Sequence, residues 1–475
     1  MNLALKKGWL PALTHLVSNV LSYVGVALVN TAAVFWLFVL PVYIREGASH
    51  PYLSLFFIVA LPAIFIGGLL LIPFGMYLRY WKETRKGTYP QEFKPLGWEN
   101  REFRNLALFV VGVTGANILV GGYYSHATVK YMDSERFCGL TCHSMIPEYT
   151  AYQDSPHRNI TCVACHVGSG KQAKLQAKLN GISQMIATLL DNHPRPIPTP
   201  VHNLRPAREI CETCHWPEKF AGYRLHVLDK FAQDEQNTWT KTVLVLAVSG
   251  AAATQGIHGF HTAPGVKVEY RSDASRQNIP WVRYTNPAGE SVDYFTEEWS
   301  AAEDDSLGLR EMDCMDCHTR PSHRFQVPGR ALDKALAAGV VDPSLPWIKQ
   351  RGLEILRAEY ATTEEAEQRI PTLVTDYYRE EYPDIFGDKR DDIERSALGL
   401  VSVYRRNVFP EMKIGWAVYP DNSGHTDFTG CFRCHFGKHE SADGQRISDN
   451  CTACHQILAR DEPEPEVLER FGIKR

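Results

Sequence analysis

The sequence predicts a membrane anchor of three helices, followed by a mainly helical and irregular domain with a small β insertion. Three runs near the N-terminus lack charged side chains, at about 8–44, 47–78 and 105–129. Each reaches the roughly 20 residues that a helix needs to cross the hydrocarbon core of a membrane. We therefore expect transmembrane helices at about 17–44, 52–79 and 105–128, within an anchor of residues 1–130.

Positive charge is distributed unevenly around these runs. Lys6 and Lys7 precede the first run, and seven Lys and Arg residues lie between 79 and 104, whereas the link between the first two runs offers only Arg45 and Glu46. Because positively charged loops stay in the cytoplasm, the N-terminus should be cytoplasmic. The chain from residue 131 onward should then lie in the periplasm of a bacterium, across the inner membrane. A cleaved signal peptide has a shorter apolar stretch, and buried core helices are the other alternative.

All twelve cysteines occur in six close pairs, and a histidine follows the second cysteine of every pair. Five pairs have the C-x-x-C-H spacing of c-type haem attachment, and the first has one more residue between its cysteines. The two thiols bond to the porphyrin, and the adjacent imidazole ligates the iron. Disulfides or zinc sites would not place histidine after every pair. The sequence therefore predicts a membrane-anchored multihaem cytochrome c with six covalently bound haem c groups. The attachment cysteines are Cys138, Cys142, Cys162, Cys165, Cys211, Cys214, Cys314, Cys317, Cys431, Cys434, Cys451 and Cys454.

The chain also has enough histidines to ligate most irons twice. The motifs supply the proximal ligands His143, His166, His215, His318, His435 and His455. At the first haem Met145 competes with His143, because thioether sulfur is also a haem ligand. The distal candidates are His157, His193, His202, His258, His261, His323, His425 and His439. Iron with two histidine ligands has no open position for a substrate, which favours electron transfer over catalysis at the haem.

Two stretches around the first three motifs carry a family resemblance. They read FCGLTCHSMIPEYTAYQDSPHRNITCVACHVG and PAREICETCHWPEKF, and they resemble the NapC/NirT family of membrane-anchored multihaem quinol dehydrogenases, which includes the NrfH type. The resemblance implies that Met145 can ligate the first iron and that Lys178 belongs to a quinol site. The family's acidic residue after that lysine is replaced here by Gln184 or Met185. With three spans and six motifs, the chain looks like a longer, inner-membrane quinol-oxidising form.

The rest of the chain divides by composition. We expect a three-haem domain at 131–235, a β-rich insertion at 236–300, a fourth haem segment at 301–330, a helical spacer at 331–410 and a two-haem module at 411–475. Within these, an amphipathic helix is predicted over 171–190, and His258 and His261 are predicted to lie on a glycine-flanked loop.

The leading hypothesis is a quinol dehydrogenase, a quinol:cytochrome oxidoreductase. A quinol from the membrane pool, menaquinol above all, gives electrons to the first haem, its protons leave past Lys178 or His126, and the electrons pass to a periplasmic acceptor protein. One alternative is an electron-wiring subunit of a larger respiratory complex that does not itself oxidise quinol. Another is a terminal multihaem reductase. A homo- or hetero-oligomer is left open, and the net charge of −4 gives no reason to expect nucleic acid as a partner.

Overall fold

The computed structural model describes residues 9–39, 60–121, 123, 131, 134–141, 143–167, 187–188, 190–199, 206–216, 222–249, 256–299 and 307–473. The chain forms two compact units, one of residues 1–141 with 162–192 and the other of residues 142–161 with 193–475. Most of the helix predicted over 171–190, with Lys178 and Gln184, lies outside the described residues, as do His126 and His202.

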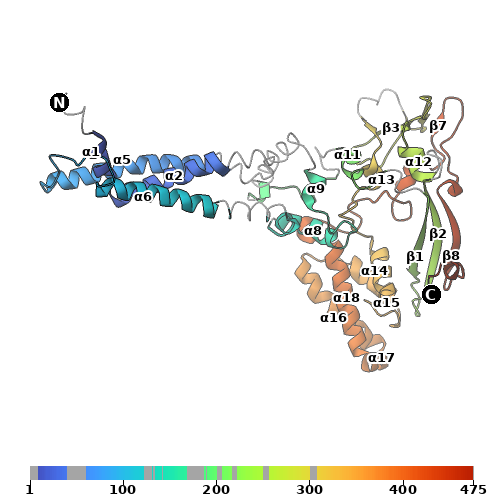
Figure 1. The fold of residues 1–475 in the computed structure, drawn as a ribbon. Helices are drawn as coiled ribbons and strands as arrows, with labels where there is room; N and C mark the ends of the chain where they lie inside the picture. The colour runs from blue at the N-terminus through green and yellow to red at the C-terminus, as the bar shows by residue number, and fades with distance from the viewer. Residues whose placement is uncertain are drawn as a thin grey trace. The chain divides into compact units, whose positions relative to one another are not determined.

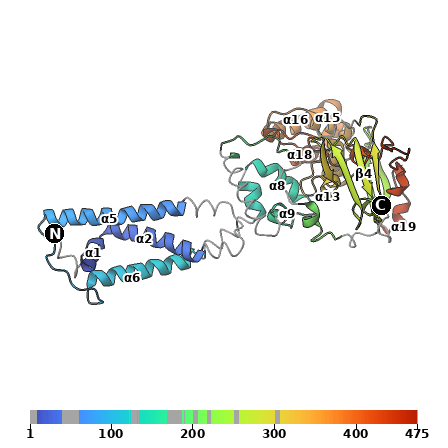
Figure 2. The same ribbon diagram turned by 90° about the horizontal axis from the view of Figure 1, so that it is seen from above.

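Among its described residues, the first unit contains three helices long and apolar enough to cross a membrane, as the sequence predicts. They are α2 (Val20–Val34), α5 (Leu61–Arg85) and α6 (Arg101–Ala116), and π-helical turns extend α2 through Phe35–Val39 and α6 through Asn117–Gly121. A short helix, α1 (Trp9–Val17), precedes them. Figures 1 and 2 both show α2 beside α5 and α6. The third helix begins at Arg101 because the Asn100 side chain accepts hydrogen bonds from the Glu102 and Phe103 amides.

Glycine allows α2 and α5 to approach each other closely. A Cβ atom on Gly25 would lie 2.8 Å from the carbonyl oxygen of Gly68, and one on Gly68 would lie 2.8 Å from the carbonyl oxygen of Gly25. The Ser22 hydroxyl also donates to the Ile72 carbonyl oxygen at 3.0 Å. Small residues at helix contacts are typical of membrane bundles, where packing and interhelical hydrogen bonds replace the hydrophobic driving force.

A four-residue ionic cluster joins α1 to α5 and α6. The His15 ring lies 2.8 Å from Glu83 through Nε2 and 2.9 Å from Glu102 through Nδ1. Arg79 donates to Glu83 from Nε at 2.8 Å and contacts Glu102 at 3.2 Å. Because α5 carries Arg79 and Glu83 while α6 carries Glu102, the cluster connects the start of α6 with the end of α5.

The helical part of the second unit follows the predicted spacer. It comprises α14 (Pro328–Ala337), α15 (Ile348–Arg357), α16 (Thr363–Glu381), α17 (Pro383–Asp388) and α18 (Arg390–Asn407). Their apolar faces meet in one core that includes the fully buried Leu332, Leu356, Ile370, Ile393 and Leu400. Most of this core comes from residues 331–408, a segment that contains no cysteine, and Phe231 of the neighbouring sheet completes it.

Two antiparallel sheets make up the β part. The first has the order β1-β2-β8, with β1 (Gly222–Phe231), β2 (Trp239–Ser249) and β8 (His455–Glu462). These three long strands lie side by side in Figure 1. The second has the order β6-β3-β4-β5-β7, with β3 (Lys267–Ser272), β4 (Trp281–Thr285), β5 (Ser291–Phe295), β6 (Gly308–Glu311) and β7 (Glu440–Ser441).

The C-terminal segment therefore supplies one strand to each sheet. β8 begins at His455, the histidine of the sixth motif, and pairs with β2, while β7 pairs with β5. Strands β2 to β5 lie within the β-rich insertion predicted at 236–300, whereas β1 and β8 lie outside it. The pairing of β2 with β8 joins segments about two hundred residues apart, and no local pattern specifies such a contact.

Candidate haem sites

Short helical turns carry the haem motifs. The second motif forms α9 (Cys162–His166), and the fourth begins with α13 (Cys314–Cys317). The third begins at Cys211, the last residue of α11 (Ala207–Cys211). The fifth and sixth begin in 3₁₀ turns at Gly430–Arg433 and Cys451–Ala453, and Cys138 of the first lies on a π-helical turn at Phe137–Thr141. In a helical turn, residues three apart lie on the same face, so both thiols of a C-x-x-C pair can face one porphyrin edge.

Cysteines of different motifs lie next to each other. A hydrogen bond with Cys138 is the main cause that lowers the pKa of Cys162 to about 7, and one with Cys211 does the same for Cys314. Motif one therefore adjoins motif two, and motif three adjoins motif four.

Motifs four and five are also neighbours. Burial raises the pKa of Cys317 to about 11 and that of Cys434 to about 12. The nearby Cys431 also raises the pKa of Cys317, and the nearby Cys317 also raises that of Cys434. Cys454 of the sixth motif has its pKa raised by burial and by the nearby Cys431. The attachment sites of motifs three to six thus follow one another in space in the order of the sequence.

Four motif histidines each face a second histidine. The ring centroids of His157 and His215 are 5.8 Å apart. Those of His258 and His318 are 6.4 Å apart, those of His261 and His435 are 5.8 Å apart, and those of His425 and His455 are 6.1 Å apart. Each pair joins one motif histidine to one distal candidate, and no histidine is used twice.

The spacing of these pairs fits haem iron. Two imidazoles bound to opposite sides of one metal ion through nitrogen bonds of about 2.0 Å have ring centroids about 6 Å apart. Among the described residues there is no cluster of three or more His, Cys, Asp or Glu side chains that could hold a bare metal ion. Two facing imidazoles beside a C-x-x-C pair are instead the donor set that completes the coordination of a porphyrin iron.

Hydrogen bonds fix the orientation of several of these rings. His261 Nδ1 lies 2.7 Å from the Ile257 carbonyl oxygen, and His435 Nδ1 lies 2.7 Å from that of Ser448. A ligating histidine usually donates its other N–H to such a group, which fixes the tautomer and the ring. The Nδ1 atoms of His157 and His455 are buried without a hydrogen-bond partner among the described residues.

α12 (Gly256–Thr262) corrects one prediction. The segment with His258 and His261 is a helix, and the expectation of a glycine-flanked loop is wrong. Gly256 has φ +74° at the first helical position, and a Cβ there would lie 2.7 Å from the Ala247 carbonyl oxygen. Glycine is needed because the helix begins directly against β2. The glycines thus serve the close approach to the sheet and do not mark a loop.

The remaining distal candidates have other surroundings. His323 Nδ1 lies 2.9 Å from the Glu148 carbonyl oxygen, and Arg195 Nε donates to His193 Nε2 at 3.2 Å. His439 is buried, and its Nε2 lies 2.7 Å from the Ile279 carbonyl oxygen. Met145 ends a 3₁₀ turn and is half-buried, while the side chain of His143 lies outside the described residues.

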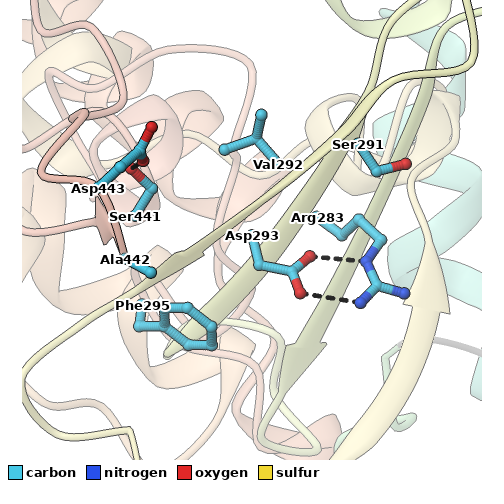
Figure 3. Close-up of a pocket in the computed structure, with 8 residues that line it drawn as sticks. All are labelled: Arg283, Ser291, Val292, Asp293, Phe295, Ser441, Ala442 and Asp443. Atoms are coloured by element: carbon cyan, nitrogen blue, oxygen red, sulfur yellow. Dashed lines mark hydrogen bonds and ion pairs between the residues drawn. The ribbon is translucent and has the colours of Figure 1, made fainter.

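A hollow at the edge of the second sheet is separate from these pairs. It is lined by Arg283, Asp293 and Phe295 on β4 and β5 and by Ser441 and Asp443 on the other side (Figure 3). Arg283 donates to Asp293 from Nε at 2.6 Å and from Nη2 at 2.8 Å. Because these charges satisfy each other and no motif histidine lines the hollow, it is a feature of the sheet surface.

The three membrane-capable helices, the haem motifs and the facing histidines define a membrane-anchored multihaem cytochrome c. Residues 99–196 match the NapC/NirT cytochrome c family, N-terminal region. The cytochrome c-type protein ImcH of Geobacter sulfurreducens is 34% identical over 463 residues, which cover 95% of this chain and 91% of that protein. The chain therefore belongs to the NapC/NirT cytochrome c family. The cytochrome c-type protein NrfH of Wolinella succinogenes is 27% identical over 90 residues, covering 18% of this chain and 51% of that protein. No solved structure matches.

Proposed function

We propose that this protein is a quinol dehydrogenase of the bacterial inner membrane that passes electrons from menaquinol through six c-type haems to a periplasmic redox protein. The observation that carries the proposal is the set of four histidine pairs with centroid separations between 5.8 and 6.4 Å. Membership of the NapC/NirT family supports quinol oxidation as the entry step.

The assignment of ligands follows from the pairs. We assign His157 to the iron held by His215, His258 to that of His318, His261 to that of His435 and His425 to that of His455. For the first two haems the candidates are His143 or Met145, His166, His193, His202 and His323. His439 is the least suited of the distal candidates, because its ring already makes backbone hydrogen bonds at both Ile279 and Cys434. Each haem, when bound, supplies one-electron iron chemistry.

The same ligand pairs distinguish a relay from a terminal reductase. Two histidines that face each other at these distances would together hold one haem iron and would leave no open position on it for a substrate. The protein's contribution is then to hold the ligands in place and to set the electrostatic surroundings. This favours electron transfer through at least the third to sixth haems.

The test of the entry step uses the purified protein in detergent. A reduced menaquinol analogue should reduce the haems, seen as growth of the ferrous absorption bands, to the extent that dithionite does. Replacement of Lys178 with Leu should slow this reduction, whereas Lys171→Leu, which removes the same charge elsewhere in the predicted helix, should not. No reduction by the quinol in a preparation that dithionite fully reduces would reject the proposal and favour a wiring subunit.

The orientation can be tested separately. With the N-terminus in the cytoplasm and the haem domain in the periplasm, protease added to spheroplasts should digest the segment after residue 131 and leave the membrane anchor behind. Protection of that segment in intact spheroplasts, with digestion only after lysis, would contradict the proposed topology.

A further inference from the structure

One short helix faces two consecutive haem motifs. His258 and His261 are both on α12, three residues apart, and their rings lie 6.4 Å from His318 and 5.8 Å from His435. His318 belongs to the fourth motif and His435 to the fifth. Residues three apart share a helix face, so the distance between the two distal rings is set by a single turn of helix.

A single guanidinium joins the same two motifs on the side of the attachment loops. Arg433 lies between Cys431 and Cys434 of the fifth motif. It donates from Nη2 to the carbonyl oxygen of Asp316, inside the fourth motif, at 2.6 Å. It also donates from Nη1 to the Arg276 carbonyl oxygen at 2.7 Å and from Nε to that of Gly430 at 2.9 Å. All three nitrogen atoms of the guanidinium therefore donate hydrogen bonds to backbone carbonyl oxygens.

The backbone that Arg433 contacts is itself fixed. The Asp316 carboxylate is buried at 2% exposure and accepts hydrogen bonds from the Tyr270 hydroxyl at 2.6 Å and from Arg310 Nε at 2.8 Å. Arg276 donates to the same oxygen at 3.2 Å, and the Asp313 amide donates to the other at 2.7 Å. A buried carboxylate with two cationic partners and a tyrosine is held in one position, because each alternative leaves a buried charge without a partner.

We propose that the fourth and fifth haem sites form one rigid dihaem unit and that Arg433 is the positioning residue that sets their relative geometry. This inference rests on the proposed function, which places haems at both motifs. α12 holds the unit on the distal side and Arg433 on the attachment side. Held in this way, the two sites would keep one separation and one orientation for the haems that they bind.

The test compares Arg433→Gln with the oxidised wild-type protein by electron paramagnetic resonance and by spectroelectrochemistry, at an unchanged content of six haems per chain by mass spectrometry. In the wild type, two haems should show a spin-coupled signal that differs from that of isolated low-spin haems. In R433Q this signal should revert toward that of isolated haems, and the potentials of these two haems should shift. Arg446→Gln is the matched control, because Arg446 is exposed in the same module and its side chain pairs with Glu440 at 2.8 Å.

Arg433→Lys separates geometry from charge. A lysine keeps the positive charge but cannot span three carbonyl groups, so R433K should behave like R433Q. Wild-type signals in R433K or in R433Q would overturn the proposal, and so would the absence of any coupled signal in the wild type. If R433Q fails to retain haem, Tyr270→Phe, which removes only one hydrogen bond to Asp316, should alter the same coupled signal, and an unchanged signal would overturn the proposal. The measurement needs no quinol. A failure of quinol oxidation would therefore reject the proposed entry step without affecting this test of the dihaem unit.

Discussion

The ring of His261 lies 5.8 Å from the ring of His435, at an interplanar angle of 72°. The two residues come from different parts of the chain, since His261 ends a helix that packs against β2 and His435 follows the 3₁₀ turn of the fifth motif. Backbone carbonyls of Ile257 and Ser448 hold the two Nδ1 atoms, each at 2.7 Å. These hydrogen bonds fix the orientation of both rings, as is usual for histidines that ligate a metal ion.

Replacement of His261 with Met should change the redox potential of one of the six proposed haems. A thioether in place of the distal imidazole raises the potential of the iron, so spectroelectrochemistry should show one haem titrating at a higher potential. The matched control is His439→Gln, since the Nε2 atom of His439 is bonded to the Ile279 carbonyl oxygen. If H439Q shifts a haem potential and H261M does not, then His439 is the distal ligand and His261 is not.

Gly68→Ala should destabilise the membrane bundle. A methyl group at Gly68 would lie 2.8 Å from the Gly25 carbonyl oxygen and 2.9 Å from Val29 Cγ2, so the helices must separate. Overpacking of this kind costs about 1–3 kcal/mol. Gly67→Ala on the same helix meets no atom within 4 Å and gains the same helix propensity. Thermal unfolding in detergent should show a lower midpoint for G68A than for G67A; equal midpoints would contradict the packing.

Lys349→Met should weaken the junction between the helical core and β1. The Lys349 ammonium donates to Asp333 Oδ1 at 2.6 Å and to the Gly329 carbonyl oxygen at 2.9 Å, and the same carboxylate oxygen accepts from the Phe231 amide at 2.9 Å. Removing the lysine leaves a buried carboxylate without its cation, which costs about 3–5 kcal/mol. The midpoint of denaturant unfolding should fall accordingly.

The double variant Lys349→Met with Asp333→Asn tests whether the unpaired carboxylate of Asp333 causes the loss of stability. The asparagine oxygen can still accept from the Phe231 amide, and no charge is left unpaired. The double variant should therefore be more stable than K349M alone. A further loss of stability in the double variant would mean that the buried charge is not the cause.

Glu411 should make the start of α16 sensitive to acid. Its carboxylate accepts from the Thr363 amide at 2.8 Å and from the Thr363 hydroxyl at 2.9 Å. Burial raises the pKa of Glu411, but these hydrogen bonds outweigh it, so the pKa lies below the ordinary value of 4.5. The stabilisation by the ionised carboxylate is then complete above about pH 4.5. It is lost as the pH falls through the lowered pKa that Glu411 has in the folded protein.

Hydrogen exchange measures this locally. Glu411→Ala should speed exchange of the first amides of α16 near neutral pH, by an amount that corresponds to at most about 1 kcal/mol, because the group is exposed and solvent screens it. The wild type should approach the variant as the pH is lowered below about 4.5. Exchange rates that differ equally at all pH values would show that the ionised carboxylate is not responsible.

Much of this protein is determined locally and can be predicted from the sequence. Membrane-spanning runs, haem attachment motifs and the helices of the Cys-free core depend on residues close together in the chain, because hydrocarbon thickness, thioether geometry and helical periodicity are all local constraints. His157 and His425 were also within reach as distal ligands, since each lies a few residues before a motif.

Only the tertiary structure decided which histidine meets which motif. His258 and His261 reach His318 and His435 because Gly256 lets α12 begin against β2, and β8 completes that sheet with residues that directly follow the sixth motif. Arg433 meets Asp316 only when the fourth and fifth motifs are folded together. Such contacts join segments far apart in sequence, and their free energy depends on the packing of the whole domain, so no local pattern in the sequence specifies them.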